Sequence, residues 1–306
     1  MLDWAGSGRR FALARVVETW GSAPRRPGAA MLVSEDGAVA GSVSGGCIEG
    51  AVITEARDCL ESGERRVLEF GVDAETAWSV GLSCGGRITV LVQPFNPASG
   101  VGASWMEALG EGRPLEIRTP LGAGQERIRE PDRDSKTGPE GEVFVHVVPR
   151  QARLLIVGGA DIATHLTAMA SRLDFEITVL DPRAVFTDPA RFDVAPASLL
   201  TAWPQEVLDD FAPDEETCIV LLTHDPKVDD PVLHAVRHRP VRYVGALGGR
   251  KTQRERADRL RAAGFSDEEI ARIRGPVGLD IGARDPSEIA VSILAELVAV
   301  RNGDSS

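Results

Sequence analysis

The sequence predicts an α/β protein: an N-terminal α/β domain over residues 1–150, followed by a Rossmann-like domain with a doubly wound parallel sheet over residues 151–306. Residues 154–157 are a continuous apolar run, and residues 177–180, on the other side of a glycine turn and a helical segment, are apolar except for Thr178. Residues 218–222 and 243–244 are further apolar runs. Strands of this kind are typical of a parallel sheet buried on both faces. The chain, at 306 residues, exceeds the range of roughly 100 to 200 residues for one domain, which favours two.

In the first domain, we expect a mainly stranded structure with one clear helix. Asp36-Gly37 is typical of a hairpin turn, and apolar residues at every fourth position from Ile48 to Leu60 predict a helix beginning just after Cys47. Residues 96–142 are dominated by proline, glycine and charge, which predicts an exposed loop. The predicted strands span residues 11–17, 29–33, 38–43, 67–70, 88–92 and 143–148.

In the second domain, a helix is expected from the glycine turn to about residue 173. Two later helix starts carry explicit caps. Ser266 is followed three positions later by Glu269, and Asp285 by Glu288, which is the pattern of a capping box.

The composition restricts the classes of partner. A net charge of −12 argues against sequence-independent binding of nucleic acid and against docking on an anionic membrane. The N-terminus lacks the features of a signal peptide, and no apolar run reaches the roughly 18 residues of a membrane span, so we expect a cytoplasmic protein. The cysteines at positions 47, 59, 84 and 218 form neither a disulfide framework nor a Cys-x-x-Cys metal pattern.

Two of these cysteines adjoin glycine pairs and are candidates for chemistry. Cys47 follows Ser44-Gly45-Gly46 at the predicted helix N-terminus, where the helix dipole favours a thiolate, which is a nucleophile and a soft ligand. Cys84 precedes a second glycine pair. Small cysteines next to glycines can also be packing choices. Cys59 and Cys218 lie within apolar patterns and are expected in the core.

The turn after the first strand of the second domain resembles a dinucleotide fingerprint. Its three small residues are Gly158, Ala160 and Ala163. Ala160 adds a methyl group where a phosphate would approach, and Asp161 adds a negative charge, so the turn is weakened as an anion site. Asp181 lies 23 positions after Gly158, where an acidic residue would bind a ribose, or it simply ends a strand before Pro182.

Polar residues follow two other strands of this domain. His224-Asp225 follows residues 218–222, and the glycine loop of residues 245–252 includes Gly248 and Arg250. Ligands on such folds bind outside the carboxyl ends of strands, so these residues could converge on one crevice. His224 could instead be a capping or core histidine held by Asp225. Arg250 is a candidate anion ligand, because a guanidinium can bind a phosphate through two parallel hydrogen bonds.

Several longer motifs occur in order through both domains. They are Thr19-Trp20-Gly21-Ser22-Ala23-Pro24-Arg25, Gly41-Ser42-Val43-Ser44-Gly45-Gly46-Cys47-Ile48-Glu49, Cys84-Gly85-Gly86, Val179-Leu180-Asp181-Pro182-Arg183, Leu222-Thr223-His224-Asp225-Pro226-Lys227, Gly245-Ala246-Leu247-Gly248 and Gly278-Leu279-Asp280-Ile281-Gly282-Ala283-Arg284. Taken together, these motifs resemble the XdhC/CoxI family, accessory factors of xanthine dehydrogenase, carbon monoxide dehydrogenase and related molybdenum hydroxylases.

The resemblance implies a protein that binds molybdenum cofactor (molybdopterin), protects it during sulfuration by a cysteine desulfurase, and inserts it into an apo molybdenum hydroxylase. It implies a maturation factor rather than an enzyme, so no catalytic residue and no metal ligand is assigned. The candidate cofactor-binding residues are Ser44, Gly45, Gly46, Cys47, Glu49, Cys84, Gly158, Asp181, Arg183, His224, Asp225, Gly245, Gly248, Arg250 and Asp280.

Two other functions stay open. The glycine turn and Asp181 also fit an NAD(P)-dependent oxidoreductase. A turn that binds nothing would leave a ligand-free scaffold that bridges desulfurase and hydroxylase. For the oligomeric state, a homodimer is the common default.

Overall fold

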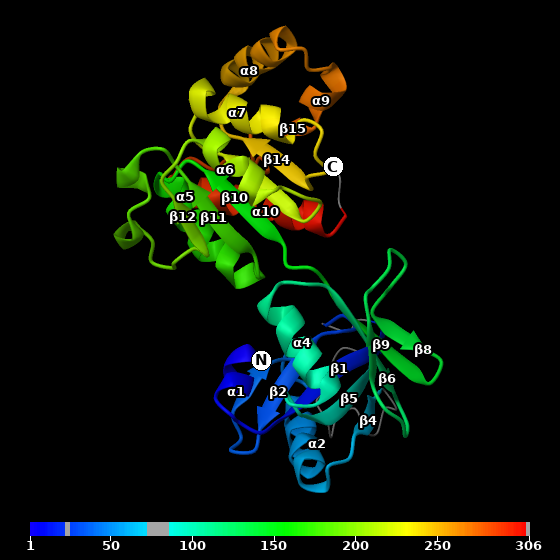
Figure 1. Cartoon of the computed structure of the whole chain (residues 1–306). Coiled ribbons are helices and arrows are strands. Elements are labelled where there is room, and N and C mark those ends of the chain that lie inside the picture. Colours follow the sequence, from blue (N-terminus) through cyan, green and yellow to red (C-terminus); the bar gives the residue numbers. More distant parts are fainter. Residues whose placement is uncertain (22–24, 72–85, 304–306) are drawn as a thin grey trace. The chain divides into compact units, whose positions relative to one another are not determined.

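The computed structural model describes residues 1–21, 25–71 and 86–303. The chain divides into two compact units, Met1–Arg150 and Gln151–Ser306 (Figure 1). No described helix is both long and apolar enough to cross a lipid bilayer.

The first unit contains an antiparallel sheet of five strands in the order β3-β2-β1-β5-β4. The hairpin at Asp36-Gly37 is confirmed, since Val33 of β2 pairs with Val39 of β3. The predicted helix is confirmed as α2 (Glu49–Ser62), and its residues Val52, Ala56 and Leu60 pack against one face of the sheet. The strands are β1 (Phe11–Trp20), β2 (Ala30–Ser34), β3 (Val39–Gly41), β4 (Arg66–Phe70) and β5 (Arg87–Phe95).

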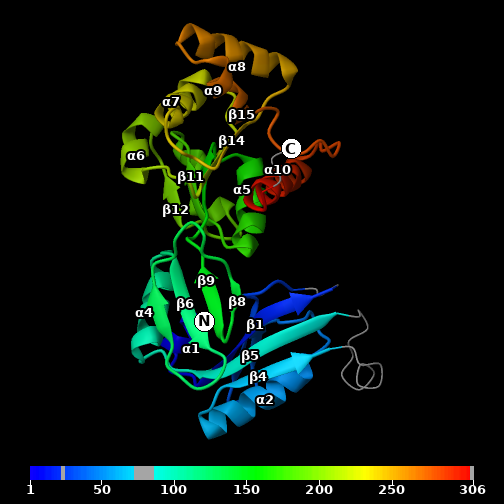
Figure 2. The ribbon, with the colours of Figure 1, turned by 90° about the vertical axis from the view of Figure 1, so that its right-hand side faces the viewer.

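A second sheet of four strands, in the order β7-β6-β9-β8, completes this unit with the short helix α1 (Leu2–Gly6) (Figure 2). The predicted strand over residues 143–148 is confirmed as β9 (Val143–Val148). The remaining described elements of this unit all lie within residues 96–142. They are α4 (Gly100–Gly110), β6 (Leu115–Pro120), β7 (Arg127–Arg129) and β8 (Gly138–Glu140).

The prediction of an exposed loop over residues 96–142 is therefore wrong. Helix α4 begins at the N-cap Ser99, whose hydroxyl accepts a hydrogen bond from the Gly102 amide at 2.9 Å, and its Trp105 is buried. The charged residues are ordered by pairing: the buried carboxylate of Glu116 forms ion pairs with Arg118 and Arg129 at 3.0 and 2.6 Å. A segment rich in charged residues is an exposed loop only when its charged side chains form no ion pairs within the fold.

The second unit is a parallel sheet in the order β12-β11-β10-β13-β14-β15, which confirms the predicted doubly wound Rossmann-like fold. Its strands are β10 (Arg153–Val157), β11 (Glu176–Leu180), β12 (Ser198–Leu200), β13 (Thr217–Leu221), β14 (Tyr243–Ala246) and β15 (Ile273–Arg274). Its helices are α5 (Asp161–Ala170), α6 (Pro204–Phe211), α7 (Pro226–Val236), α8 (Arg250–Ala262), α9 (Asp267–Ala271) and α10 (Pro286–Arg301).

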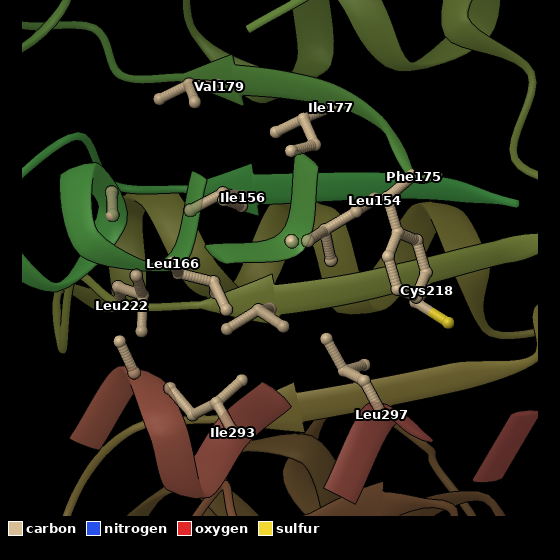
Figure 3. Close-up of a cluster of buried hydrophobic side chains, with 14 of the residues drawn as sticks. Leu154, Ile156, Leu166, Phe175, Ile177, Val179, Cys218, Leu222, Ile293 and Leu297 are labelled. Atoms are coloured by element: carbon tan, nitrogen blue, oxygen red, sulfur yellow. The ribbon is translucent and has the colours of Figure 1, made fainter. Parts of the chain in front are cut away.

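Helices cover both faces of this sheet. On one face, Leu154 and Ile156 of β10 pack with Leu166 of α5 and with Ile293 and Leu297 of α10 (Figure 3). On the other face, Leu155 and Val157 pack with residues of α6, α7 and α8. Because the side chains of a strand alternate between faces, both sets must be apolar, which explains the uninterrupted runs in the sequence.

Both predicted helix caps are present. The Ser266 hydroxyl accepts a hydrogen bond from the Glu269 amide, and the Glu269 carboxylate accepts one from the Ser266 amide at 2.8 Å. The Glu288 carboxylate accepts from the Asp285 amide at 3.3 Å, at the start of α10.

Candidate functional site

In the first unit, residues 42–48 form a tight loop between β3 and α2, which we call the Cys47 loop. Gly45 and Gly46 have φ angles of +81° and +126°, in the region that favours glycine, which explains the glycine pair at this position. These conformations turn successive backbone amides toward one point. Such a concave arrangement of N–H groups binds an anionic oxygen.

The anion bound there is the carboxylate of Glu49, the first residue of α2. It accepts hydrogen bonds from the amides of Ser44, Gly45 and Gly46 at 2.8–3.0 Å and from the hydroxyls of Ser42 and Ser44. Burial opposes ionisation of this group, but the hydrogen bonds from Ser44 and Ser42 outweigh it and lower the pKa of Glu49 to about 2. Glu49 therefore holds the shape of the loop as a carboxylate.

Cys47 is half-buried and immediately precedes the N-cap Ile48 of α2. Its amide and that of Ile48 both donate to the Ser44 hydroxyl, at 3.0 and 3.1 Å. The predicted location at a helix N-terminus is confirmed. Because the partial positive charge of a helix N-terminus favours a thiolate, this position suits a nucleophile or a soft ligand.

The other cysteines differ from Cys47. Cys59 and Cys218 are buried in the cores, and burial raises the pKa of both thiols, that of Cys218 to about 12. Both are therefore poor nucleophiles at neutral pH. The candidate Cys84 lies outside the described residues.

In the second unit, three turns meet at the carboxyl ends of β10, β13 and β14. Gly158, with φ of +104°, lies so close to Thr223 that a Cβ there would be 2.8 Å from the threonine methyl carbon. A Cβ on Gly248 would lie 3.4 Å from Nδ1 of His224. The structure thus brings Gly158, His224 and Gly248 together, where the strand order reverses between β10 and β13, which is where ligands of doubly wound folds bind.

His224 is exposed and has a φ of +59°, a conformation that histidine adopts uncommonly. Its neighbour Asp225 is the N-cap of α7 and accepts a hydrogen bond from the Lys227 amide at 2.9 Å. Asp225 therefore has a structural role, whereas no core packing accounts for the exposed imidazole.

Asp181 and Arg183 form a closed pair at the end of β11. The buried carboxylate of Asp181 accepts from the Gly159 amide at 3.0 Å, from the Arg183 amide at 2.9 Å, and from two nitrogens of the Arg183 guanidinium at 2.8 and 2.9 Å. Burial acts against ionisation, but the bonds from Arg183 and Gly159 outweigh it, so the pKa of Asp181 is lowered. Each oxygen of Asp181 already accepts two hydrogen bonds from the chain itself.

The glycine turn also packs against the chain's own residues. A Cβ on Gly159 would lie 2.2 Å from the carbonyl oxygen of Phe186. At the start of α5, the carboxylate of Asp161 pairs with Arg191 at 3.0 Å. The helix N-terminus at which a dinucleotide would place its pyrophosphate thus carries an internal ion pair.

The remaining candidates occupy three different settings. Strand β14 extends two residues further than the sequence predicts, so Gly245 lies inside the strand, where Tyr243 and Val277 leave no room for a Cβ. Arg250 is exposed and is the first residue of α8. Asp280 is exposed in the loop between β15 and α10.

The sequence did not indicate the buried network that supports the His224 turn. Asp229 and Arg256 form an ion pair at 3.1 Å, both nearly inaccessible to solvent, and the Thr223 hydroxyl donates to Asp229. The side-chain amide of Gln253 donates hydrogen bonds through Nε2 to the carbonyls of Ala246 and Gly248, both at 2.9 Å, which holds the glycine loop. An acidic residue in α7 and a basic one in α8 look like surface charges until the two helices are placed together.

Among the described residues, no cluster of three or more histidine, cysteine, aspartate or glutamate side chains could hold a metal ion. The two candidate regions, the Cys47 loop and the His224 turn, thus offer a thiol and polar side chains on glycine-rich backbone.

Comparisons with known proteins agree across both units. The XdhC and CoxI family matches residues 4–71, and the XdhC Rossmann domain matches residues 154–297. A relative from Escherichia coli (strain K12), named molybdenum cofactor insertion chaperone PaoD, is 32% identical over 96% of this chain and 85% of its own length. A Bacillus subtilis (strain 168) protein, named as a probable xanthine dehydrogenase subunit, is 25% identical over 94% of this chain and 92% of its own length.

The fold has also been solved in a Bacillus halodurans protein described as a xanthine dehydrogenase. Its structure matches this one with a TM-score of 0.82, over 100% of this chain and 96% of that one, at 24% sequence identity. The resemblance inferred from the motifs is therefore confirmed, and the chain belongs to the XdhC and CoxI family.

Proposed function

We propose that the chain binds molybdenum cofactor, protects it during sulfuration by a cysteine desulfurase, and inserts it into an apo hydroxylase of the xanthine dehydrogenase or carbon monoxide dehydrogenase type. In this proposal the chain is a maturation factor and not an enzyme. The sequence similarity to the E. coli insertion chaperone extends over nearly the whole chain. This similarity supports a role in handling molybdenum cofactor.

The structural observation that carries the proposal is the setting of Cys47. Its thiol is half-buried at the N-terminus of a 14-residue helix, on a loop that Glu49 ties together through five hydrogen bonds. A thiolate is a soft ligand suited to a transition metal and to sulfur chemistry. A rigid loop presents this ligand without an ordering cost at the moment of binding.

The second unit would bind an anionic part of the cofactor, such as the pterin phosphate or a nucleotide. The exposed imidazole of His224 and the guanidinium of Arg250 are the side chains suited to this on the turns after β13 and β14. Arg183 is already committed to Asp181 through three hydrogen bonds, so it would contribute its remaining donors.

The test is purification of the chain from cells that make molybdenum cofactor. Absorbance and molybdenum content should show retained cofactor, and coexpression should raise the activity of an apo molybdenum hydroxylase. Protein that neither retains cofactor nor raises that activity would overturn the proposal. Recovery of desulfurase and hydroxylase by cofactor-free protein, with no cofactor retained, would instead favour the scaffold.

The nicotinamide-dependent alternative has weaker support. In a dinucleotide site, the residue at the position of Asp181 accepts hydrogen bonds from a ribose. Here that carboxylate is buried and bonded to Gly159 and Arg183. Titration with NAD⁺ and NADP⁺ should show no binding at millimolar concentration, and saturable binding would revive this alternative.

A further inference from the structure

The described residues cover only part of one face of the five-stranded sheet. Near the middle of β1 and β5, Arg15 and Leu91 are buried beneath residues of the second sheet, including Thr119 and Phe144. Figure 2 shows β1, β4 and β5 extending past β8 and β9. Toward that end the face opens, and Trp20 is 70% exposed.

This open end contains a hollow of about 400 Å³, which we call the Trp20 hollow. Its volume lies within the range of small-molecule sites, roughly 300–1,000 Å³. The hollow is lined by Glu18, Thr19, Trp20, Glu69, Arg87 and Thr89.

The strand register explains why the lining residues other than Thr19 share one face of the sheet. Glu18 lies opposite Thr89, which in turn lies opposite Glu69 on β4, and Trp20 lies opposite Arg87. Side chains two positions apart on a strand point to the same side. The carboxylates of Glu18 and Glu69 therefore lie at one level across the three strands. The indole of Trp20 and the guanidinium of Arg87 lie two positions away along β1 and β5.

The charges of the hollow take no part in the ion pairs that tie the described segments together. Among the described residues, none forms an ion pair with Glu18, Glu69 or Arg87. The aliphatic part of Arg87 lies along Gly71, where an added Cβ would be 3.3 Å from its Cγ. Glycine at that position thus leaves room for the arginine beside the hollow.

We propose that the Trp20 hollow binds a flat amino-lactam heterocycle of the pterin class that carries an anionic substituent. The indole of Trp20 would stack on the ring, as exposed aromatic side chains do with bases. The ring's adjacent amino and lactam N–H groups are two parallel donors, which match the two oxygens of a carboxylate from Glu18 or Glu69. Arg87 would bind the anionic group. This inference rests on the proposed function, because it locates the pterin of the cofactor.

The test uses the full chain and pterin-6-carboxylate as the probe, measured by equilibrium dialysis. The wild-type chain should bind it, and adenosine, which lacks the amino-lactam edge, should bind more weakly. Trp20→Ala should weaken binding about tenfold or more, from lost stacking, and the double variant Glu18→Gln/Glu69→Gln should weaken it through the lost carboxylates. Trp203→Ala, at an exposed tryptophan of the second unit, is the matched control and should bind normally.

Failure of this inference can be told apart from failure of the proposed function. No binding of the probe to the wild-type chain at millimolar concentration overturns the inference, as does equal binding by wild type and Trp20→Ala. If Trp20→Ala also retains whole molybdenum cofactor like wild type, the proposed function stands and the pterin binds elsewhere. Since Trp20 is largely exposed, its removal should leave the circular dichroism spectrum unchanged.

Discussion

The carboxylate of Glu49 accepts hydrogen bonds from both the amide and the hydroxyl of Ser44, at 2.9 and 2.5 Å. The same hydroxyl accepts from the amides of Cys47 and Ile48. Ser44 is thus the connection through which Glu49 orients the backbone at Cys47. Glu49 acts as a positioning residue, which leads to the first prediction.

Glu49→Gln should loosen the Cys47 loop. One oxygen of Glu49 accepts from three donors and the other from two, so a side-chain amide leaves at least two donors without an acceptor. We expect a loss of about 1–2 kcal/mol in the free energy of unfolding and an altered rate of Cys47 alkylation by iodoacetamide. Glu61→Gln, at an exposed position on the same helix, is the control and should change neither. An unaltered alkylation rate in Glu49→Gln would contradict the positioning role.

Cys47→Ala should abolish cofactor retention and change the free energy of unfolding by about 1 kcal/mol or less, because the side chain is only half-buried. Cys59→Ala is the control with the opposite expected result, because Cys59 is buried in the core and is not part of the Cys47 loop. It should lower the free energy of unfolding without loss of cofactor retention. The measurements are molybdenum content and denaturant unfolding. Normal retention by Cys47→Ala would reduce Cys47 to a packing residue.

His224 allows function to be separated from backbone conformation. His224→Asn should leave the free energy of unfolding within about 0.5 kcal/mol, because asparagine readily adopts a positive φ, but it should lower cofactor retention. His224→Val, with a branched side chain at the φ of +59°, should cost about 1–2 kcal/mol. Retention by His224→Asn equal to that of wild type would show that the imidazole is not a ligand.

Acid should destabilise the first unit through His146. Its ring lies 5.4 Å from that of Trp105 and 5.8 Å from that of Phe144, and burial, aided by the positive charge of Arg15, lowers its pKa from 6.5 to about 3. Between these values the unfolded chain binds a proton that the folded chain does not. Stability should therefore fall as pH decreases through this window, by about 1.4 kcal/mol per pH unit.

The variant His146→Phe removes this titration and should flatten the dependence of Tm on pH between about 6 and 4. His238→Gln, which changes an exposed histidine, should leave the dependence as in wild type. Parallel pH profiles for His146→Phe and wild type would show that His146 does not cause the acid sensitivity.

Removing one partner of the Asp229–Arg256 ion pair should lower the free energy of unfolding far more than removing both. Burial raises the pKa of Asp229, opposed by the Thr223 hydrogen bond and by Arg256. Asp229→Leu leaves the guanidinium buried without its counter-ion and should cost about 3–5 kcal/mol. The double variant Asp229→Leu/Arg256→Met should recover much of this loss in denaturant unfolding. Additive losses would indicate that the two charges do not interact.

Several features of the fold followed from local pattern alone. Short apolar runs predicted β10, β11 and β13, and the spacing from Ile48 to Leu60 predicted α2, because burial on two faces or on one helical stripe leaves a distinct pattern. The position of Cys47 before that helix followed in the same way. The prediction of an exposed loop over residues 96–142 was wrong because the ion pair of Glu116 and Arg129 forms between neighbouring strands, and composition does not reveal which strands are neighbours.

The candidate site depended more on tertiary structure. Three contacts follow from how strands and turns meet. The carboxylate of Asp181 accepts its hydrogen bonds from Gly159 and Arg183, Asp161 pairs with Arg191, and Gly248 lies beside His224. Sequence spacing shows which residue types follow each strand, since local backbone preferences and hydrophobic periodicity are properties of short segments. It does not show which donors and acceptors remain available, because hydrogen bonds and ion pairs between distant segments form only once the sheet and its helices have assembled.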